Sequence, residues 1–121
     1  MKTLALATLI GIAAGLLGAL CGVGGGIVMV PAFGAILGLE QRQAVATSLA
    51  VIVIVSFVST TSNLREPGLV DWRIVALTAV GAACAAWFGS DWMRSFGNQT
   101  LTRIFAVALI AIGAWKLWRG A

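Results

Sequence analysis

Long stretches of the chain carry no charged residue, and these stretches predict its structural elements. A run of about 18 or more apolar residues without charge is typical of a helix that spans a membrane. Two of the runs are shorter, and they reach that length when the arginine and lysine stems at their ends extend to the membrane surface. The uncharged runs are residues 3–39, 43–64, 74–90 and 104–115.

The first run is too long for one crossing and is interrupted by a glycine-rich segment. The sequence CGVGGG occupies residues 21–26, and each glycine costs a helix interior about 1 kcal/mol relative to alanine. The pattern therefore predicts a helix over 3–20, non-helical backbone over 21–26 and a short helix over 27–39, near whose start Pro31 lies. Non-helical backbone within a membrane is tolerated only where protein buries it or where it lines a watery cavity. This segment is the first place where we expect a functional site.

The whole chain is predicted to be an all-α integral membrane protein with four to five transmembrane elements, including a glycine-broken hairpin near the N-terminus. The connections are too short to hold a soluble domain, so we expect one transmembrane domain over 1–121. A secretory signal peptide is an alternative interpretation of the first run, but the large Leu20 before Cys21 and the membrane helix that follows disfavour cleavage. The predicted elements are residues 3–20, 27–39, 44–62, 74–89 and 103–118.

Composition supports this class and excludes several kinds of chemistry. The chain is 60% hydrophobic and 10% charged, with a mean hydropathy of +1.03, whereas an ordinary soluble domain is about 25% charged. It contains no histidine and no tyrosine, which excludes histidine-based metal sites, Ser-His-Asp triads and Cys-His dyads. We therefore expect no enzymatic activity, no metal and no cofactor. No aspartate, glutamate or lysine lies in the interior of a predicted element, away from its ends, which disfavours a proton-coupled pump.

The distribution of positive charge depends on how the first run crosses the membrane. If its halves form a hairpin, the termini lie on opposite sides of the membrane, with four cations on each side. If the run makes a single broken crossing, the termini share a side, with five cations on that side and three on the other. Equal numbers give no preferred orientation, so the hairpin predicts a chain that inserts both ways and pairs with itself antiparallel. In the hairpin arrangement the cations are Lys2, Arg42, Arg94 and Arg103 on one side, and Arg65, Arg73, Lys116 and Arg119 on the other.

The glycine-rich segment has the chemistry of an anion site. It is not a dinucleotide-binding motif, because Ile27 stands where the third glycine of G-x-G-x-x-G would fall. A helix that begins near Ile27 would direct its first free amides and the positive end of its dipole into the membrane. Broken helices of this kind bind substrates in many transporters. The alternative is a simple packing kink.

Two groups of hydroxyl side chains lie in the third element. Thr47 and Ser48 are expected to donate to an anion beside the glycine segment, or alternatively to bond a carbonyl one turn back. The second group makes the far end of the element polar, which suits either a wet vestibule or an ordinary interface. It consists of Ser56, Ser59, Thr60, Thr61 and Ser62, and it ends in Asn63.

Four segments, in order along nearly the whole chain, resemble the sulfite exporter family (TauE/SafE type, also called toluene sulfonate uptake permeases). They are GVGGGIVMVP at 22–31, ATS at 46–48, GLVDW at 68–72 and LTRIFA at 101–106. Members of that family are inner-membrane permeases for sulfur-containing anions and typically hold two homologous halves in one chain. This sequence resembles one half of such an inverted-repeat transporter.

The resemblance implies a permease for a sulfite- or organosulfonate-like oxyanion in a bacterial-type inner membrane. The expected partners are the small anion, the lipid bilayer and a second copy of the chain, paired antiparallel, with no nucleic acid. The alternatives are a half-transporter that needs a different partner chain and a structural membrane protein that transports nothing. The residues expected to bind the anion are Gly22, Gly24, Gly25, Gly26, Ile27, Thr47 and Ser48.

Overall fold

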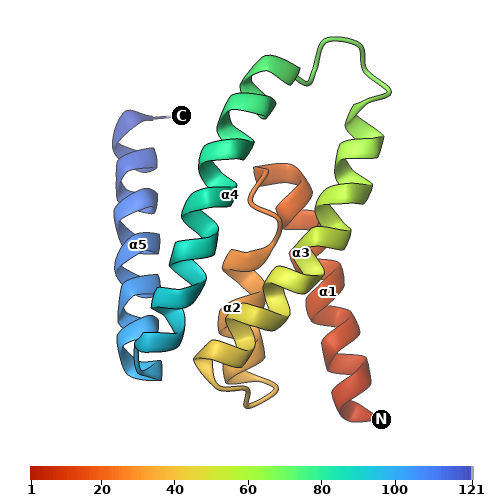
Figure 1. Cartoon of the computed structure of the whole chain (residues 1–121). Coiled ribbons are helices and arrows are strands. Elements are labelled where there is room, and N and C mark those ends of the chain that lie inside the picture. Colours follow the sequence, from red (N-terminus) through yellow and green to blue (C-terminus); the bar gives the residue numbers. More distant parts are fainter. Residues whose placement is uncertain (121) are drawn as a thin grey trace.

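The computed structural model describes residues 1–120, and within them every regular element is a helix (Figure 1). Four of the helices are long and apolar enough to span a membrane, and the second is shorter. This confirms the expected all-α membrane architecture and a multi-pass membrane protein. The helices are α1 (Lys2–Cys21), α2 (Gly26–Ala35), α3 (Gln41–Asn63), α4 (Trp72–Ser95) and α5 (Asn98–Arg119).

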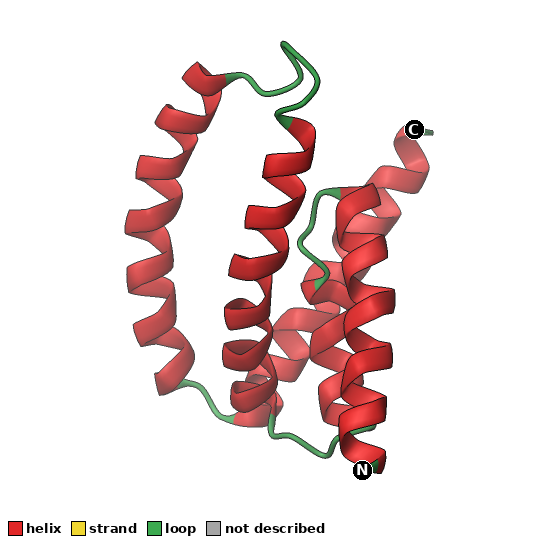
Figure 2. Ribbon diagram, turned by 90° about the vertical axis from the view of Figure 1, so that its right-hand side faces the viewer, coloured by secondary structure: helices red, strands yellow, loops and turns green. Residues whose placement is uncertain are grey.

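The first uncharged run folds as a hairpin, not as one broken crossing. α1 and α2 lie antiparallel with the glycine-rich segment between them, and the two chain termini lie at opposite ends of the molecule (Figures 1 and 2). α1 ends where the left-handed Gly22 donates its N–H to the Gly18 carbonyl at 2.8 Å. The returning loop passes so close to α1 that a Cβ on Gly18 would lie 2.5 Å from the Gly25 nitrogen. The hairpin therefore needs glycine both near the end of α1, at position 18, and in the loop, at position 25.

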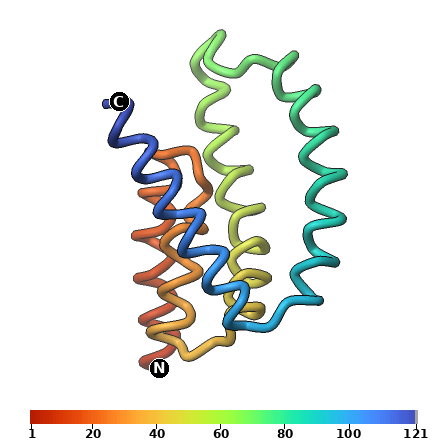
Figure 3. The backbone as a smooth tube through the Cα atoms, turned by 90° about the vertical axis from the view of Figure 1, so that its left-hand side faces the viewer, coloured from red at the N-terminus to blue at the C-terminus, as the bar shows by residue number. Residues whose placement is uncertain are grey.

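α2 is the centre of the core because it packs between α1 and α3. The buried hydrophobic side chains come from these three helices, and α5 adds only the half-buried Phe105 as it crosses the bundle obliquely (Figure 3). α4 and α5 contain no buried residue. Their large apolar side chains are left for lipid or for another protein. The buried hydrophobic residues are Ile10, Ala14, Met29, Val30, Phe33 and Ala44.

The helix ends differ from the expected ones mainly at the end of α2 and between α4 and α5. α2 ends at Ala35 instead of residue 39, and the connection that follows contains Gly38 in a left-handed conformation. α4 and α5 each extend into residues 90–102, which lie between the predicted elements, so that only residues 96–97 separate the two helices. Charged residues mark where the membrane ends, but a helix can continue beyond that point when its polar side chains face water.

A polar network fixes the corner between α4 and α5 to the start of α3. The Arg42 guanidinium donates to the Phe96 carbonyl from Nη2 at 2.6 Å and from Nε at 3.2 Å. The Asn98 side chain accepts from the Arg42 amide at 3.4 Å and donates to Glu40 at 3.4 Å. Glu40 also takes part in the capping box that begins α3. Away from this corner α4 stands apart from α3 (Figure 2).

Candidate functional site

The loop between α1 and α2 contains a series of unpaired backbone amides. Within residues 1–120 the N–H groups of residues 23–27 donate no well-formed hydrogen bond. The Gly25 carbonyl, in contrast, accepts from Val28 and Met29 at 3.1 and 3.0 Å and so starts α2. Gly25 is left-handed, with φ at 80°. The loop thus presents consecutive donors together with the positive end of the α2 dipole.

A pocket of about 230 Å³ lies between this loop, the end of α1 and the far half of α3. Its side-chain donors are hydroxyls and one amide, and none of its lining residues is ionisable. Neutral donors of this kind can donate hydrogen bonds to an anion without adding a positive charge to the membrane interior. The lining residues are Gly18, Ala19, Gly22, Gly24, Val55, Ser56, Ser59, Thr60 and Asn63.

The pocket forms because α3 continues past the loop and presents one face to it. The loop packs against Ile52 of α3, so closely that a Cβ added to Gly24 would lie 2.8 Å from the Ile52 Cγ2 atom. The polar residues beyond Ile52 recur at spacings of three and four, which places them on neighbouring rows of the helix surface. Thr61 lies outside this group, and its hydroxyl donates to the Phe57 carbonyl at 2.8 Å. Within residues 1–120 the hydroxyls of Ser56, Ser59 and Thr60 and the Asn63 amide donate to no group.

The residues that the sequence assigned to the anion are only partly brought together. Gly22 and Gly24 line the pocket, whereas Gly25 is packed against α1, where an added Cβ would lie 2.5 Å from the Ala14 carbonyl oxygen. Gly26 and Ile27 form the first turn of α2 beside the loop and do not line the pocket.

The two expected hydroxyl ligands lie elsewhere on α3. Ser48 is 2% exposed, and its hydroxyl donates to the Val45 carbonyl at 2.8 Å. This is the internally satisfied arrangement that the sequence left open as the alternative. Thr47 is exposed and does not line the pocket. Their assignment as anion ligands stays a prediction.

Once the first run is known to fold as a hairpin, counting along the helices finds the hydroxyls that face the loop. α2 descends from the loop at 1.5 Å per residue, and α3 ascends again at the same rate. Ten residues of α2 correspond to about the same number on α3, so the loop is level with residues just beyond 51. This register points to Ser56 and its neighbours, not to Thr47 and Ser48.

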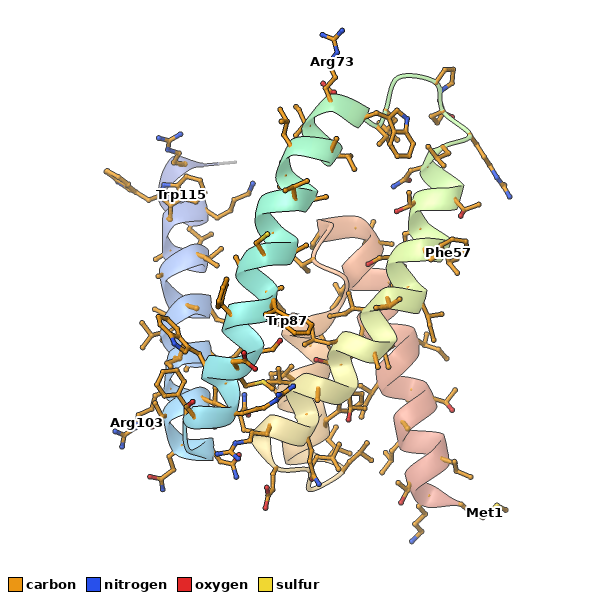
Figure 4. All side chains as sticks on the ribbon, in the orientation of Figure 1. Met1, Phe57, Arg73, Trp87, Arg103 and Trp115 are labelled. Carbon is orange, nitrogen blue, oxygen red and sulfur yellow. The ribbon has the colours of Figure 1, made fainter. Side chains whose placement is uncertain are left out.

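The other features of the described chain supply less suitable chemistry. A larger pocket of about 420 Å³ between α3, α4 and α5 is almost wholly apolar, with Gln41 and Ser90 as its only polar residues. Cys21 and Cys84 are free and exposed. Within residues 1–120 no group of side chains could hold a metal ion. The charged groups lie at the two ends of the molecule, as the positions of Arg73 and Arg103 illustrate (Figure 4).

A family model described as "Sulfite exporter TauE/SafE" matches residues 2–121 of the chain. The chain is 34% identical over 110 residues to the "Probable membrane transporter protein YunE" of Bacillus subtilis (strain 168), which covers 88% of this chain and 38% of that protein. It is 31% identical over 121 residues to a "Probable membrane transporter protein" of Xylella fastidiosa (strain 9a5c), covering 98% of this chain and 44% of that one. The chain thus spans less than half the length of these relatives. No solved structure matches it significantly.

Proposed function

The chain belongs to the sulfite exporter TauE/SafE family, and we propose that it is a membrane permease for a sulfur-containing oxyanion of the sulfite or organosulfonate class. The observation that carries this proposal is the pocket beside the α1–α2 loop. Gly24, whose amide is unpaired, and neutral side-chain donors of α3 line it without any charged side chain. An oxyanion accepts several hydrogen bonds at once, so these groups can replace its hydration shell.

In this proposal the unpaired amide of Gly24 donates to the anion, and the unpaired amides of Gly25, Gly26 and Ile27 lie next to the pocket at the start of α2. Gly22 lines the pocket, but its own amide is bonded to the Gly18 carbonyl. The side chains of Ser56, Ser59 and Thr60 add donors on the opposite wall of the pocket. The lack of a cation in the pocket favours release, because a strongly held ion would not leave. The transport step is a movement that opens the pocket to one side of the membrane and then to the other.

We propose further that the working unit is a homodimer. In this proposal a second copy of the chain stands opposite the first across the membrane plane. The equal number of cations at the two ends of the molecule supports insertion in both orientations. Rocking of one copy against the other then provides alternating access.

The test is anion flux into liposomes that contain only the purified chain, with Gly25→Leu as the variant. We expect flux of sulfite or a small sulfonate for the natural chain and its loss for the variant. A side chain at position 25 would meet the Ala14 carbonyl and would also strain a left-handed backbone. Membrane insertion of the variant should remain intact, because α1 and α3–α5 are unchanged.

The matched control is Gly11→Ala, where an added Cβ meets nothing within 4 Å; its flux should equal that of the natural chain. Natural rates in Gly25→Leu would contradict the proposed site. Flux that is absent until a second, similar chain is added would indicate a half-transporter. Flux that no partner restores would indicate a structural membrane protein.

A further inference from the structure

A polar pocket of about 440 Å³ lies at the end of the bundle where α3 and α5 begin. Two side chains of opposite charge line it, Glu40 and Arg103, and we call it the polar corner pocket. Within residues 1–120 the Arg103 guanidinium pairs with no carboxylate and donates no hydrogen bond. The Glu40 carboxylate accepts from the Asn98 side chain and from the Gln43 amide, which leaves acceptor sites free. The pocket thus offers one cation and one anion to a ligand.

Two apolar hollows begin at the edges of the polar corner pocket and lead away from the charged end of the bundle. Gln41 lines both this pocket and the apolar pocket of about 420 Å³ between α3, α4 and α5. Arg103 lines both this pocket and an apolar groove of about 430 Å³ along α5. The other residues of the groove are Ile104, Val107, Ala108 and Ala111, which follow one another along the helix. One polar pocket therefore continues into two apolar spaces.

The apolar pocket is open because α4 faces it with small side chains. Ala86 and Gly89 line it, and a Cβ added to Gly89 would meet nothing within 4 Å. α4 contains no buried residue, and it stands apart from α3 away from the corner (Figure 2). The side chains of this chain therefore do not fill the space. An empty space would forfeit van der Waals contacts along its whole lining, so an apolar occupant is favoured there.

We propose that the polar corner pocket and its two apolar extensions bind one phospholipid whose headgroup carries a phosphate and a primary ammonium, as that of phosphatidylethanolamine does. The Arg103 guanidinium binds the phosphate, to which it can donate two parallel hydrogen bonds. The Glu40 carboxylate binds the ammonium and would repel a headgroup that carries negative charge alone. One acyl chain lies in the apolar pocket and the other along α5. This site is separate from the proposed anion pocket, with which it shares no lining residue.

The headgroup supplies the selectivity that the apolar spaces cannot supply. Lipid tails are as apolar as the side chains of the protein, so an acyl chain gains little when it leaves the bilayer for a groove. Charge pairing at the membrane surface distinguishes one lipid from another, because each headgroup carries a different set of charges. The bound lipid fills the gap beside α4 and thereby connects α4 with α3 and α5.

Native mass spectrometry of the purified chain, with lipids added one at a time, tests the site. We expect phosphatidylethanolamine to bind about fivefold more tightly than phosphatidylglycerol, which has the phosphate but lacks the ammonium. Arg103→Gln should weaken the binding of phosphatidylethanolamine about fivefold, because one cation near the membrane surface is lost. The matched control is Lys116→Gln near the other end of α5, which should leave the binding unchanged.

Two further substitutions separate the headgroup from the acyl chains. Glu40→Gln keeps an oxygen that can accept at the start of α3, and it should abolish the preference for phosphatidylethanolamine over phosphatidylglycerol. Gly89→Leu places a side chain in the apolar pocket and should weaken both lipids by similar factors. The matched control for the second is Gly81→Leu, because Gly81 is equally open on α4 but does not line that pocket.

Three outcomes overturn the inference: equal affinity of the natural chain for the two lipids, a preference that survives Glu40→Gln, or unchanged lipid binding in Gly89→Leu. If Gly89→Leu loses a dimer mass but no lipid, a second copy of the chain fills the space and the inference is wrong. The lipid comparison uses the natural chain, so it stands even where a variant fails to fold. Lipid binding and anion flux are measured separately, so the failure of one leaves the other proposal standing.

Discussion

At the scale of single residues, the candidate site depends on which polar groups are already satisfied inside the chain. Ser48 and Thr61 both donate to carbonyls of their own helix, at 2.8 Å each. Such hydroxyls have little hydrogen-bonding capacity left for a ligand. Thr60, one residue before Thr61, lines the pocket and donates to no group within residues 1–120. Adjacent threonines of the same helix therefore have opposite roles in the proposed mechanism.

This contrast predicts different effects of the same substitution at the two positions. Thr60→Val keeps the side-chain shape and removes a donor to the anion. A hydrogen bond to a charged group contributes about 1.5–3 kcal/mol, so the half-saturating anion concentration in the liposome assay should rise about tenfold or more. Thr61→Val should leave it unchanged. Equal effects of the two substitutions would show that the hydroxyl of Thr60 does not bind the anion.

At the scale of elements, the structure separates a well-packed part from a loosely attached one. α2 is packed between α1 and α3, and the buried core lies there. α4 and α5 are held mainly at one corner, where Arg42 donates twice to the carbonyl that ends α4. A cation at a helix C-terminus also interacts favourably with the helix dipole. This corner is the point at which the two parts of the molecule are held together.

The importance of the corner can be measured by comparing two arginines. Arg42→Ala should lower the free energy of unfolding in detergent by about 1 kcal/mol or somewhat more, because hydrogen bonds to a charged group are lost. Arg94→Ala should change it by less than about 0.5 kcal/mol, since its pairing with Asp91 is an exposed contact within one helix turn. Thermal unfolding of both purified variants provides the measurement. A larger loss for Arg94→Ala would show that the corner does not hold the helices together.

At the scale of the whole molecule, the hairpin determines how the cations are distributed. α1 and α2 return the chain to its starting side, so the remaining three helices leave the termini at opposite ends (Figure 1). Each end then carries the same number of arginine and lysine side chains. A single broken crossing would have placed both termini on one side and would have given a bias. The fold thus supports the antiparallel pairing that we propose.

The equal distribution predicts that the chain can be forced into one orientation by few substitutions. Arg65→Gln together with Arg73→Gln removes two cations from one end, and the positive-inside rule then places the other end in the cytoplasm. Reporters fused to each terminus should show both orientations for the natural chain and one for this variant. Flux should fall in the variant, because antiparallel pairs can no longer form. A natural chain with a single orientation would contradict dual insertion.

The sequence by itself determined the membrane helices, the position of the break and the polar character of the far end of the third helix. Uncharged runs and a cluster of glycines act locally, through the cost of burying charge and the cost of glycine in a helix. For the same reason the sequence also indicated free amides at the start of the short helix. The end of α4 and the start of α5 were less well predicted, because a helix does not have to end where the membrane does.

Only the tertiary structure decided that the first run is a hairpin and which hydroxyls face the loop. Both depend on how far one helix descends before the next ascends, a relation between segments distant in sequence. Ser48 and Ser56 are equally polar in the sequence, but α2 ends the descent at a level that buries Ser48 and places Ser56 beside the glycines. The packing of α2 between α1 and α3 sets this level. The loop passes so close to Gly18 that α2 can begin at only one height along α1.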